Sequence, residues 1–252
     1  KGAPLYYDCS TDDARLTLET ALDAVKHGAV VSTYTRVVGF MRDHSGRVSG
    51  VRVRDEVTGE EREIQANAII NATGPWSDRT RLLGTSEDSA RLRPTKGIHI
   101  VVDRERLHTT HAVVCFHPRD GRVLFAIPWG DRTYIGTTDT DYKDDPGEVA
   151  ATGEDVRYLL EASNIYFPES SLTEDDVIST WAGVRPLIAE DSSDSASSVS
   201  REHDIRVGSD GLITIAGGKL TTYRRMGGEV VDTAVQMLRL TDKLPDGLRT
   251  AD

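Results

Sequence analysis

The spacing of apolar positions predicts a helix near the start of the chain. Residues 11–27 are apolar at helical intervals, and Gly28 follows as a stop signal. Thr11 is the predicted N-cap, because a threonine side chain can accept a hydrogen bond from a free N–H group of the first turn. The helix is expected to pack one apolar stripe on a core, formed by Leu18, Ala21, Leu22 and Val25.

Strands are predicted to follow this helix. A brief apolar strand is expected at 30–34. Three further strands, separated by glycine-containing turns, are predicted at 36–43, 47–55 and 61–66. Their many polar positions are typical of an antiparallel meander with one solvated face. The segment 68–72 is apolar without alternation, which predicts a strand buried on both faces of a parallel sheet.

The second half of the chain mixes strands and helices in the same way. Tight turns divide residues 99–140 into several strands, and a helix at 154–163 precedes a strand at 177–184. A short buried strand at 212–216 runs into two glycines and an amphipathic helix. Pieces of a parallel sheet thus flank a largely antiparallel one. The predicted fold class is mixed α/β, with a chain that leaves one domain and returns to it.

Composition excludes several classes of protein. The 252 residues include 30 Lys and Arg against 41 Asp and Glu, which gives a net charge of −11. Such a chain repels nucleic acid, so any bound phosphate needs a local cationic cluster. Cys9 and Cys115 are far apart, so neither a disulfide framework nor a structural zinc site is expected. No apolar run is long enough to span a membrane, and no signal peptide is predicted.

Two predicted strand ends carry glycines that suit a ligand. Ala72-Thr73-Gly74 follows an apolar strand, and Gly74 lets the backbone approach a bound molecule. The segment 217–221 opens a helix, whose free N–H groups suit an anion or the N1/C2 carbonyl edge of a flavin. The alternatives are an ordinary turn at the first site and N-capping by Thr221 or Thr222 at the second.

Three cations and one histidine are further candidates. Arg185 closes an apolar strand, and Arg201 and Lys219 lie on other elements. A cluster of these cations would bind phosphate oxygens and offset the acidic net charge locally. His99, which follows a glycine at a predicted strand start, is a candidate proton acceptor. Each arginine could instead pair with a carboxylate, as Arg201 could with Glu202, and His99 could be structural.

Eight motifs, taken in order, resemble those of a known family. They are Tyr6–Asp8, Asp12–Leu16, Asn71–Trp76, Arg93–Gly97, Ile127–Trp129, Ile135–Thr140, Gly183–Leu187 and Gly217–Arg224. In order and spacing they resemble the FAD-dependent glycerol-3-phosphate dehydrogenases. The likeness runs from about Leu5 to Leu238.

The resemblance implies a partial FAD domain of the glutathione-reductase type, interleaved with an antiparallel substrate domain. We place the FAD domain at 5–90 and 205–240, the substrate domain at 91–204 and a loosely held tail at 241–252. The implied reaction is oxidation of sn-glycerol 3-phosphate to dihydroxyacetone phosphate. Hydride would pass to FAD N5, and electrons would pass on to quinone.

The resemblance also implies roles for individual residues. Arg185 would sit over the substrate and help to remove its hydroxyl proton, with His99 near the reacting carbon. Arg201 and Lys219 would hold substrate polar groups or phosphate. The FAD contacts would come from Val31, Ala72, Thr73, Gly74, Gly217, Gly218, Lys219, Leu220 and Thr221.

Members of the family open with a strand–GxGxxG–helix unit and end with a helical region, and the sequence contains neither. The chain alone is therefore expected to bind FAD poorly. A cytoplasmic location is expected, or a peripheral one at the inner face of the cell membrane through the missing regions, and a homodimer is left open. No metal site and no nucleic-acid partner are predicted.

Two other functions stay open. An oxidase would return the electrons to dioxygen and release hydrogen peroxide. A non-catalytic remnant would keep the substrate domain as a binding or assembly module, as the missing GxGxxG motif suggests. Arg185, Arg201 and Lys219 argue against the remnant, because such a module has no need of a cationic cluster.

Overall fold

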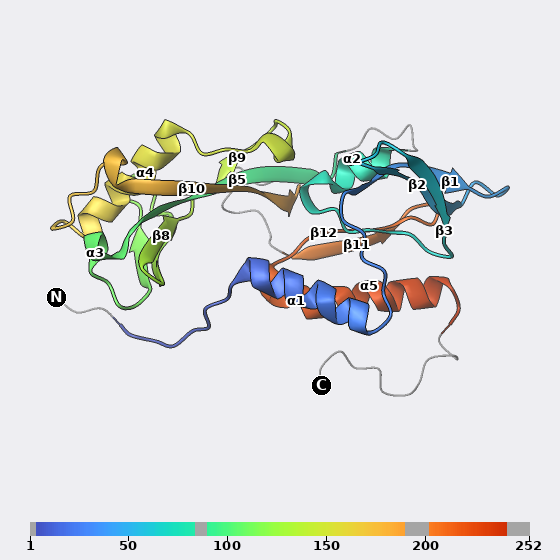
Figure 1. The fold of residues 1–252 in the computed structure, drawn as a ribbon, viewed down its shortest axis with the longest axis horizontal. Coiled ribbons are helices and arrows are strands. Elements are labelled where there is room, and N and C mark those ends of the chain that lie inside the picture. Colours follow the sequence, from blue (N-terminus) through green and yellow to red (C-terminus); the bar gives the residue numbers. More distant parts are fainter. Residues whose placement is uncertain (1–3, 84–89, 190–201, 241–252) are drawn as a thin grey trace.

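The computed structural model describes residues 4–83, 90–189 and 202–240. Within these ranges the chain forms three sheets in an elongated molecule (Figure 1). Helices α1 (Asp13–Lys26) and α5 (Tyr223–Met237) lie along its lower side in Figure 1. The predicted loop at 189–200 falls almost wholly outside the described residues, as do the tail at 241–252 and Arg201.

The predicted meander is confirmed. β1 (Thr35–Arg42), β2 (Val48–Asp55) and β3 (Glu61–Gln65) form an antiparallel sheet in the order of the sequence. The predicted strand at 30–34 is wrong. Val30 is exposed, and a turn ends at Tyr34 with φ of +54°, so the chain reverses before β1 begins.

A six-stranded antiparallel sheet forms the left part of the molecule in Figure 1, in the order β10-β5-β8-β7-β6 with β9 beside β5. Its strands are β5 (Leu92–Asp103), β6 (Val113–Phe116), β7 (Val123–Trp129), β8 (Arg132–Gly136), β9 (Thr140–Asp141) and β10 (Val177–Ile188). The short helices and turns around it are α3 (Arg104–Leu107), η2 (Pro146–Glu148) and η3 (Glu174–Asp176).

Two predicted boundaries in this sheet are wrong. β10 continues to Ile188, so Arg185 lies within a strand and does not close it. β5 begins at Leu92, so His99 lies in the second half of a twelve-residue strand and not at its start. Both strands are long because they pair with each other over almost their whole length, from Val102–Val177 to Leu92–Ile188.

Helix α4 (Gly153–Tyr166) covers one face of this sheet and completes the main core. The core side chains of the sheet and the helix are Ile98, Ile100, Val102, Leu124, Leu159 and Leu160. Thr152 and Asp155 form a capping box at the start of α4. The Asp155 carboxylate also lies 2.6 Å from Lys96 Nζ on β5, which ties the helix start to the sheet.

The third sheet joins the two ends of the chain. β4 (Ile70–Asn71) is parallel to β12 (Ile213–Gly217), and β11 (His203–Val207) is antiparallel to β12. The predicted parallel pairing is confirmed, but burial on both faces is wrong, because β4 has two residues and Ile70 is 41% exposed. The turns and helix that follow these strands are η1 (Gly74–Trp76), α2 (Ser77–Leu82) and η5 (Leu220–Thr222).

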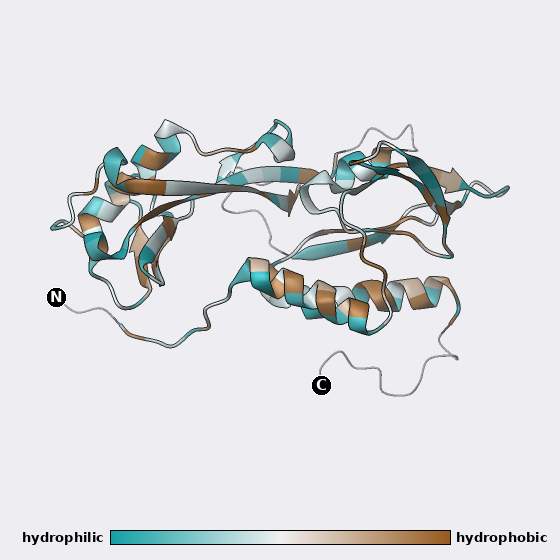
Figure 2. Cartoon of the chain, viewed as in Figure 1, coloured by the Kyte–Doolittle hydropathy of each residue, from teal (hydrophilic) through white to brown (hydrophobic). Residues whose placement is uncertain are grey.

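The predicted first helix is present, with two differences. Asp12 caps it instead of Thr11, since the Asp12 carboxylate accepts a hydrogen bond from the Arg15 N–H group. Its apolar stripe does not lie on a core, because Leu18, Leu22 and Val25 are all about half exposed. Figure 2 shows apolar bands on both α1 and α5. Within the described ranges, no helix has the length and apolar character that crossing a bilayer requires.

Candidate functional site

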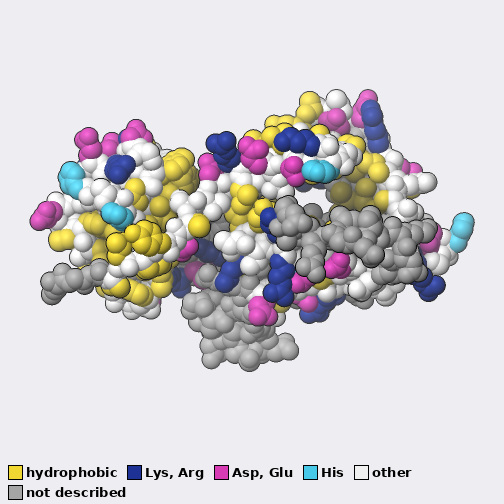
Figure 3. Space-filling view, turned by 90° about the horizontal axis from the view of Figure 1, so that it is seen from below, with side chains coloured by type: hydrophobic (Ala, Val, Ile, Leu, Met, Phe, Trp, Pro, Cys, Tyr) yellow, Lys and Arg dark blue, Asp and Glu magenta, His cyan; other side chains and the backbone are white. Residues whose placement is uncertain are grey.

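The face of the six-stranded sheet opposite α4 carries aromatic side chains and His99. Directly paired residues of antiparallel strands share a face, and His99 pairs with Gly136 on β8 and with Trp181 on β10. Viewed from below, hydrophobic side chains gather on this part of the molecule (Figure 3). The exposed large apolar residues of these strands on that face are Phe116, Val123, Phe125, Trp129 and Trp181.

The imidazole ring of His99 lies near two aromatic rings. Its ring centroid is 5.7 Å from that of Tyr134 and 6.1 Å from that of Trp181. The ring lies against Gly136, where a Cβ would stand 2.7 Å from His99 Cγ, so a side chain at Gly136 would displace the imidazole. Among the described residues, no hydrogen-bond partner of the His99 ring nitrogens is found.

The charge state of His99 follows from its surroundings. Burial lowers the pKa of the imidazole below its ordinary value, and the positive charge of Arg185 lowers this pKa further. Asp13, at the start of α1, raises the pKa of His99 and partly opposes the other two effects. The lowered pKa favours the neutral ring, which is the form that can accept a proton.

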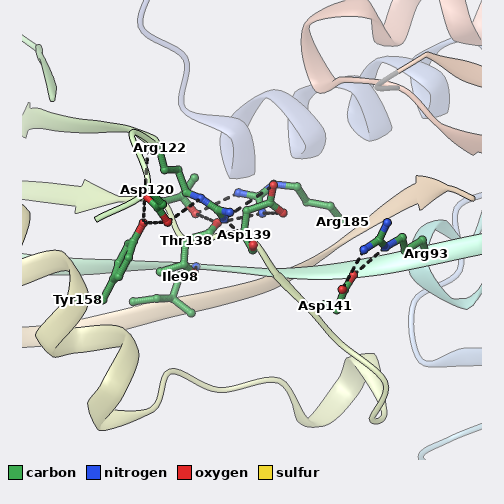
Figure 4. Close-up of polar contacts among 10 residues, drawn as sticks. Arg93, Ile98, Asp120, Arg122, Thr138, Asp139, Asp141, Tyr158 and Arg185 are labelled. Carbon is green, nitrogen blue, oxygen red and sulfur yellow. Dashed lines mark hydrogen bonds and ion pairs between the residues drawn. The ribbon is translucent and has the colours of Figure 1, made fainter. Parts of the chain in front are cut away.

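Arg185 lies on the same face as His99. Its guanidinium packs over Gly97, which precedes His99 by two residues, or about 7 Å along β5. The Nη2 atom donates to Thr137 Oγ1 at 3.0 Å, and Nη1 donates to the Thr138 carbonyl at 3.1 Å. Nη1 also lies 3.3 Å from Asp139 Oδ1, and Figure 4 shows this ion pair beside the separate pair of Arg93 and Asp141. Among the described residues, the segment Thr137–Asp139 holds the partly buried Arg185 guanidinium.

The glycine-bearing strand ends meet at one edge of the third sheet. β4 and β12 are parallel neighbours, so Gly74 and the Gly217–Gly218 pair follow strand ends of the same direction. All three glycines have φ between +56° and +84°. Ile188, the last residue of β10, contacts the position where a Gly217 Cβ would stand. The strand that carries Arg185 therefore ends beside the glycine pair.

The helix start after these glycines has no side-chain cap. Neither η5 nor α5 receives a capping hydrogen bond from a side chain, and the Thr222 hydroxyl donates to the Lys219 carbonyl instead. Thr222 stands at the N-cap position of α5, but the alternative of a capping hydrogen bond from Thr221 or Thr222 is wrong. Lys219, Leu220 and Thr221 are exposed, so their backbone and side chains can be reached from solvent.

The first glycine turn is organised by a residue that the sequence analysis did not single out. Asn71 is buried, donates to the Ser77 carbonyl at 2.8 Å and accepts from the Thr73 hydroxyl at 2.7 Å. Thr73 therefore shapes the turn with its side chain. Ala72 is exposed, as is Val31 in the loop after α1.

Other functional candidates were also missed. Gly97, Gly136 and the segment Thr137–Asp139 belong to quoted motifs, but nothing in their spacing showed that they would surround Arg185 and His99. A glycine inside a strand is a signal of close approach by another group. Arg201 lies outside the described residues, so its predicted place beside Arg185 and Lys219 stays a prediction. In the described part of the chain, no grouping of three or more His, Cys, Asp or Glu is arranged to hold a metal ion.

Comparison with known proteins decides the family. A family model described as FAD dependent oxidoreductase matches residues 1–224. The chain belongs to this family. This FAD-dependent oxidoreductase is similar to an aerobic glycerol-3-phosphate dehydrogenase of Staphylococcus haemolyticus. The two sequences are 44% identical over 97% of the chain. Identity to the protein of the same name from Staphylococcus aureus strain USA300 is 42% over 95% of the chain.

Solved structures agree with this placement. The glycerol-3-phosphate dehydrogenase from Bacillus halodurans, complexed with FAD, matches 92% of the chain at 44% identity with a TM-score of 0.83. A glycine oxidase from Bacillus cereus, at 19% identity and a TM-score of 0.56, shares the fold. The predicted mixed α/β fold and the resemblance to glycerol-3-phosphate dehydrogenases are confirmed. The chain spans 44% of the length of the first relative and 44% of the Bacillus halodurans chain.

Proposed function

We propose that this chain carries the substrate face and part of the cofactor site of an FAD-dependent glycerol-3-phosphate dehydrogenase. The observation that supports this most is the placement of Arg185 and His99 on one sheet face, each over a glycine of a neighbouring strand. The names of relatives at 42–44% identity supply the substrate and the reaction.

The glycine edge suits the flavin of FAD. An uncapped helix start offers free N–H groups and the positive end of a dipole, which favour the electron-rich carbonyl edge of the ring. Gly217, Gly218, Leu220 and Thr221 would hold that edge. Gly74, with Ala72 and Thr73, would let the backbone approach the dinucleotide, and Val31 would contact its adenine side. The bound FAD would supply the acceptor for hydride.

His99 and Arg185 would act on the substrate hydroxyl. The neutral imidazole of His99 would accept the hydroxyl proton as the C2–H bond gives up hydride, so that the alcohol becomes a ketone. Arg185 would donate to the substrate oxygen and fix its position. Lys219 and Arg201 would bind the phosphate, which needs local positive charge in a chain of net charge −11.

Quinone is the electron acceptor in this proposal, since the relatives are named dehydrogenases and not oxidases. A quinone acceptor would bring a cytoplasmic enzyme to the inner face of the cell membrane. The domain boundaries at 5–90, 91–204 and 205–240 are part of the same proposal.

Two measurements test the function. Calorimetry with glycerol 3-phosphate should show binding to the chain that is lost in R185M and unaffected in R62M, which changes an exposed arginine of β3. Absence of binding in the wild-type chain, with and without FAD, would contradict the proposal. Where FAD is retained, anaerobic glycerol 3-phosphate should bleach it. Faster recovery of colour with air than with a quinone analogue would favour the oxidase.

A further inference from the structure

We propose that Asp139 is a positioning residue that holds the Arg185 guanidinium beside His99, in the orientation that binds a phosphorylated alcohol. The role of Arg185 rests on the proposed function. The role of Asp139 rests on contacts between Asp139, Arg185 and Arg122, in a segment that connects β8 to β9.

Contacts other than the one with Arg185 also hold Asp139 in place. Its side chain is only 8% exposed, and Arg122, just before β7, donates from Nη1 to the Asp139 backbone carbonyl. The Arg122 guanidinium also lies 4.0 Å from Asp139 Oδ2. The Asp139 carboxylate thus lies between two guanidinium groups, one on each oxygen (Figure 4). A carboxylate buried in this way has little freedom to follow Arg185.

The segment around Asp139 is also tied to β5. The Thr138 hydroxyl accepts a hydrogen bond from the Ile98 N–H group at 3.1 Å, and Thr138 is buried. This bond connects the acceptors of Arg185 to the strand that carries His99, because Ile98 precedes His99. The acceptors of Arg185 and the strand that carries His99 are therefore connected through this hydrogen bond.

The arrangement matters because an arginine side chain has several rotatable bonds. A guanidinium that must be ordered when a ligand binds loses affinity through rotamer entropy. Here three acceptors within the described ranges hold the side chain against Gly97, and the side chain is still 28% exposed. Asp139 itself is a poor substrate ligand, since a carboxylate repels phosphate. Its contribution passes through Arg185.

The chain contains a matched control. Asp141 pairs with Arg93 through bonds of 2.8 and 3.0 Å, only two residues further along, and its side chain is 49% exposed. Asp139→Asn removes the charge at nearly constant shape, and Asp141→Asn makes the same change at a position away from Arg185.

The first readout needs no ligand. In the wild-type chain, NMR of the arginine side chains should show slow rotation of the Arg185 guanidinium, assigned by its absence in R185M. D139N should make this rotation fast, and D141N should not. R122Q keeps the Asp139 carboxylate but removes the guanidinium that holds it, so rotation of the Arg185 guanidinium should have an intermediate rate. This variant replaces D139N in the test if D139N does not fold. An unchanged Arg185 signal in both D139N and R122Q would overturn the proposal.

The second readout is a double-mutant cycle on affinity for glycerol 3-phosphate, measured by calorimetry. D139N should weaken binding about tenfold or more, the scale of a lost charge-assisted hydrogen bond. In R185M, the further change D139N should have no effect, because its effect passes through Arg185. Equal losses in both backgrounds would show a merely structural role. If the wild-type chain binds no glycerol 3-phosphate, the proposed function fails, and the NMR readout still decides the role of Asp139.

Discussion

The Arg185 guanidinium lies so close over Gly97 of the neighbouring strand that a Cβ there would stand 2.5 Å from Nη2. Atoms at that separation overlap, so one of the two groups would have to move. The position of Arg185 therefore depends on the absence of a side chain on β5, as well as on the acceptors at Thr137, Thr138 and Asp139.

The first prediction follows from this contact. G97A should displace Arg185 and weaken binding of glycerol 3-phosphate about tenfold or more, as calorimetry would show. G183A is the matched control. Gly183 pairs directly with Gly97 across the two strands, but a Cβ there meets no atom within 4 Å. Equal effects of the two substitutions would contradict the steric argument.

A second prediction concerns the protonation of His99. W181A should expose the imidazole, and its pKa should rise toward the ordinary value, because burial is the main cause of the lowered pKa. R185M should also raise the pKa by removing a nearby positive charge. NMR titration of the ring protons measures both.

W129A is the control for this measurement. Trp129 contacts Trp181 at a centroid distance of 5.3 Å, and no contact between Trp129 and His99 is found among the described ring pairs. Its removal should leave the His99 pKa nearly unchanged. A pKa that stays low in W181A would show that Trp181 does not shield the ring.

A third prediction addresses stability. Lys96 and Asp155 form a nearly buried ion pair, with side chains 12% and 9% exposed. K96M should lower the free energy of unfolding by about 3–5 kcal/mol, because it leaves a carboxylate buried without its cation. Urea unfolding measures the loss. R157A, which breaks the exposed pair with Glu174, should cost less than about 1 kcal/mol.

The same pair predicts a pH dependence. Burial by itself raises the pKa of Asp155, but hydrogen bonds from Lys96 and Thr152 outweigh it, and the pKa is lowered overall. The folded state therefore binds this proton less readily than the unfolded state does. The stabilisation is present above the ordinary carboxyl pKa and is lost as pH falls through the lowered value. D155N should be less stable than wild type at pH 7, and this difference should shrink in acid.

A fourth prediction concerns the two thiols. Burial raises the pKa of Cys115 to about 11, and this residue is only 3% exposed, whereas Cys9 is exposed. A disulfide reagent at pH 8 should modify one thiol quickly in the folded chain and both in urea, because the thiolate is the reactive form. Rapid reaction of Cys115 in the folded chain, shown by peptide mapping, would mean that the strand β6 opens readily.

Elements with strong local signals could be predicted from the sequence. Helix α4 has apolar residues at helical spacing, and β12 is a short apolar run that ends in two glycines. The strand at 30–34 was mispredicted, since an apolar run does not show whether a partner strand exists. Val30 has no such partner in the described ranges and lies exposed.

The sequence by itself determined the family, the mixed α/β class and the side chains that are available for chemistry. Motif order and residue periodicity can be read along the chain without knowing how it folds. The tertiary structure alone decided which groups meet. Asp139 is 46 residues from Arg185. Gly97 lies under Arg185 because antiparallel pairing of β5 and β10 sets their register. That register depends on the packing of the whole sheet against α4, which no short stretch of residues encodes.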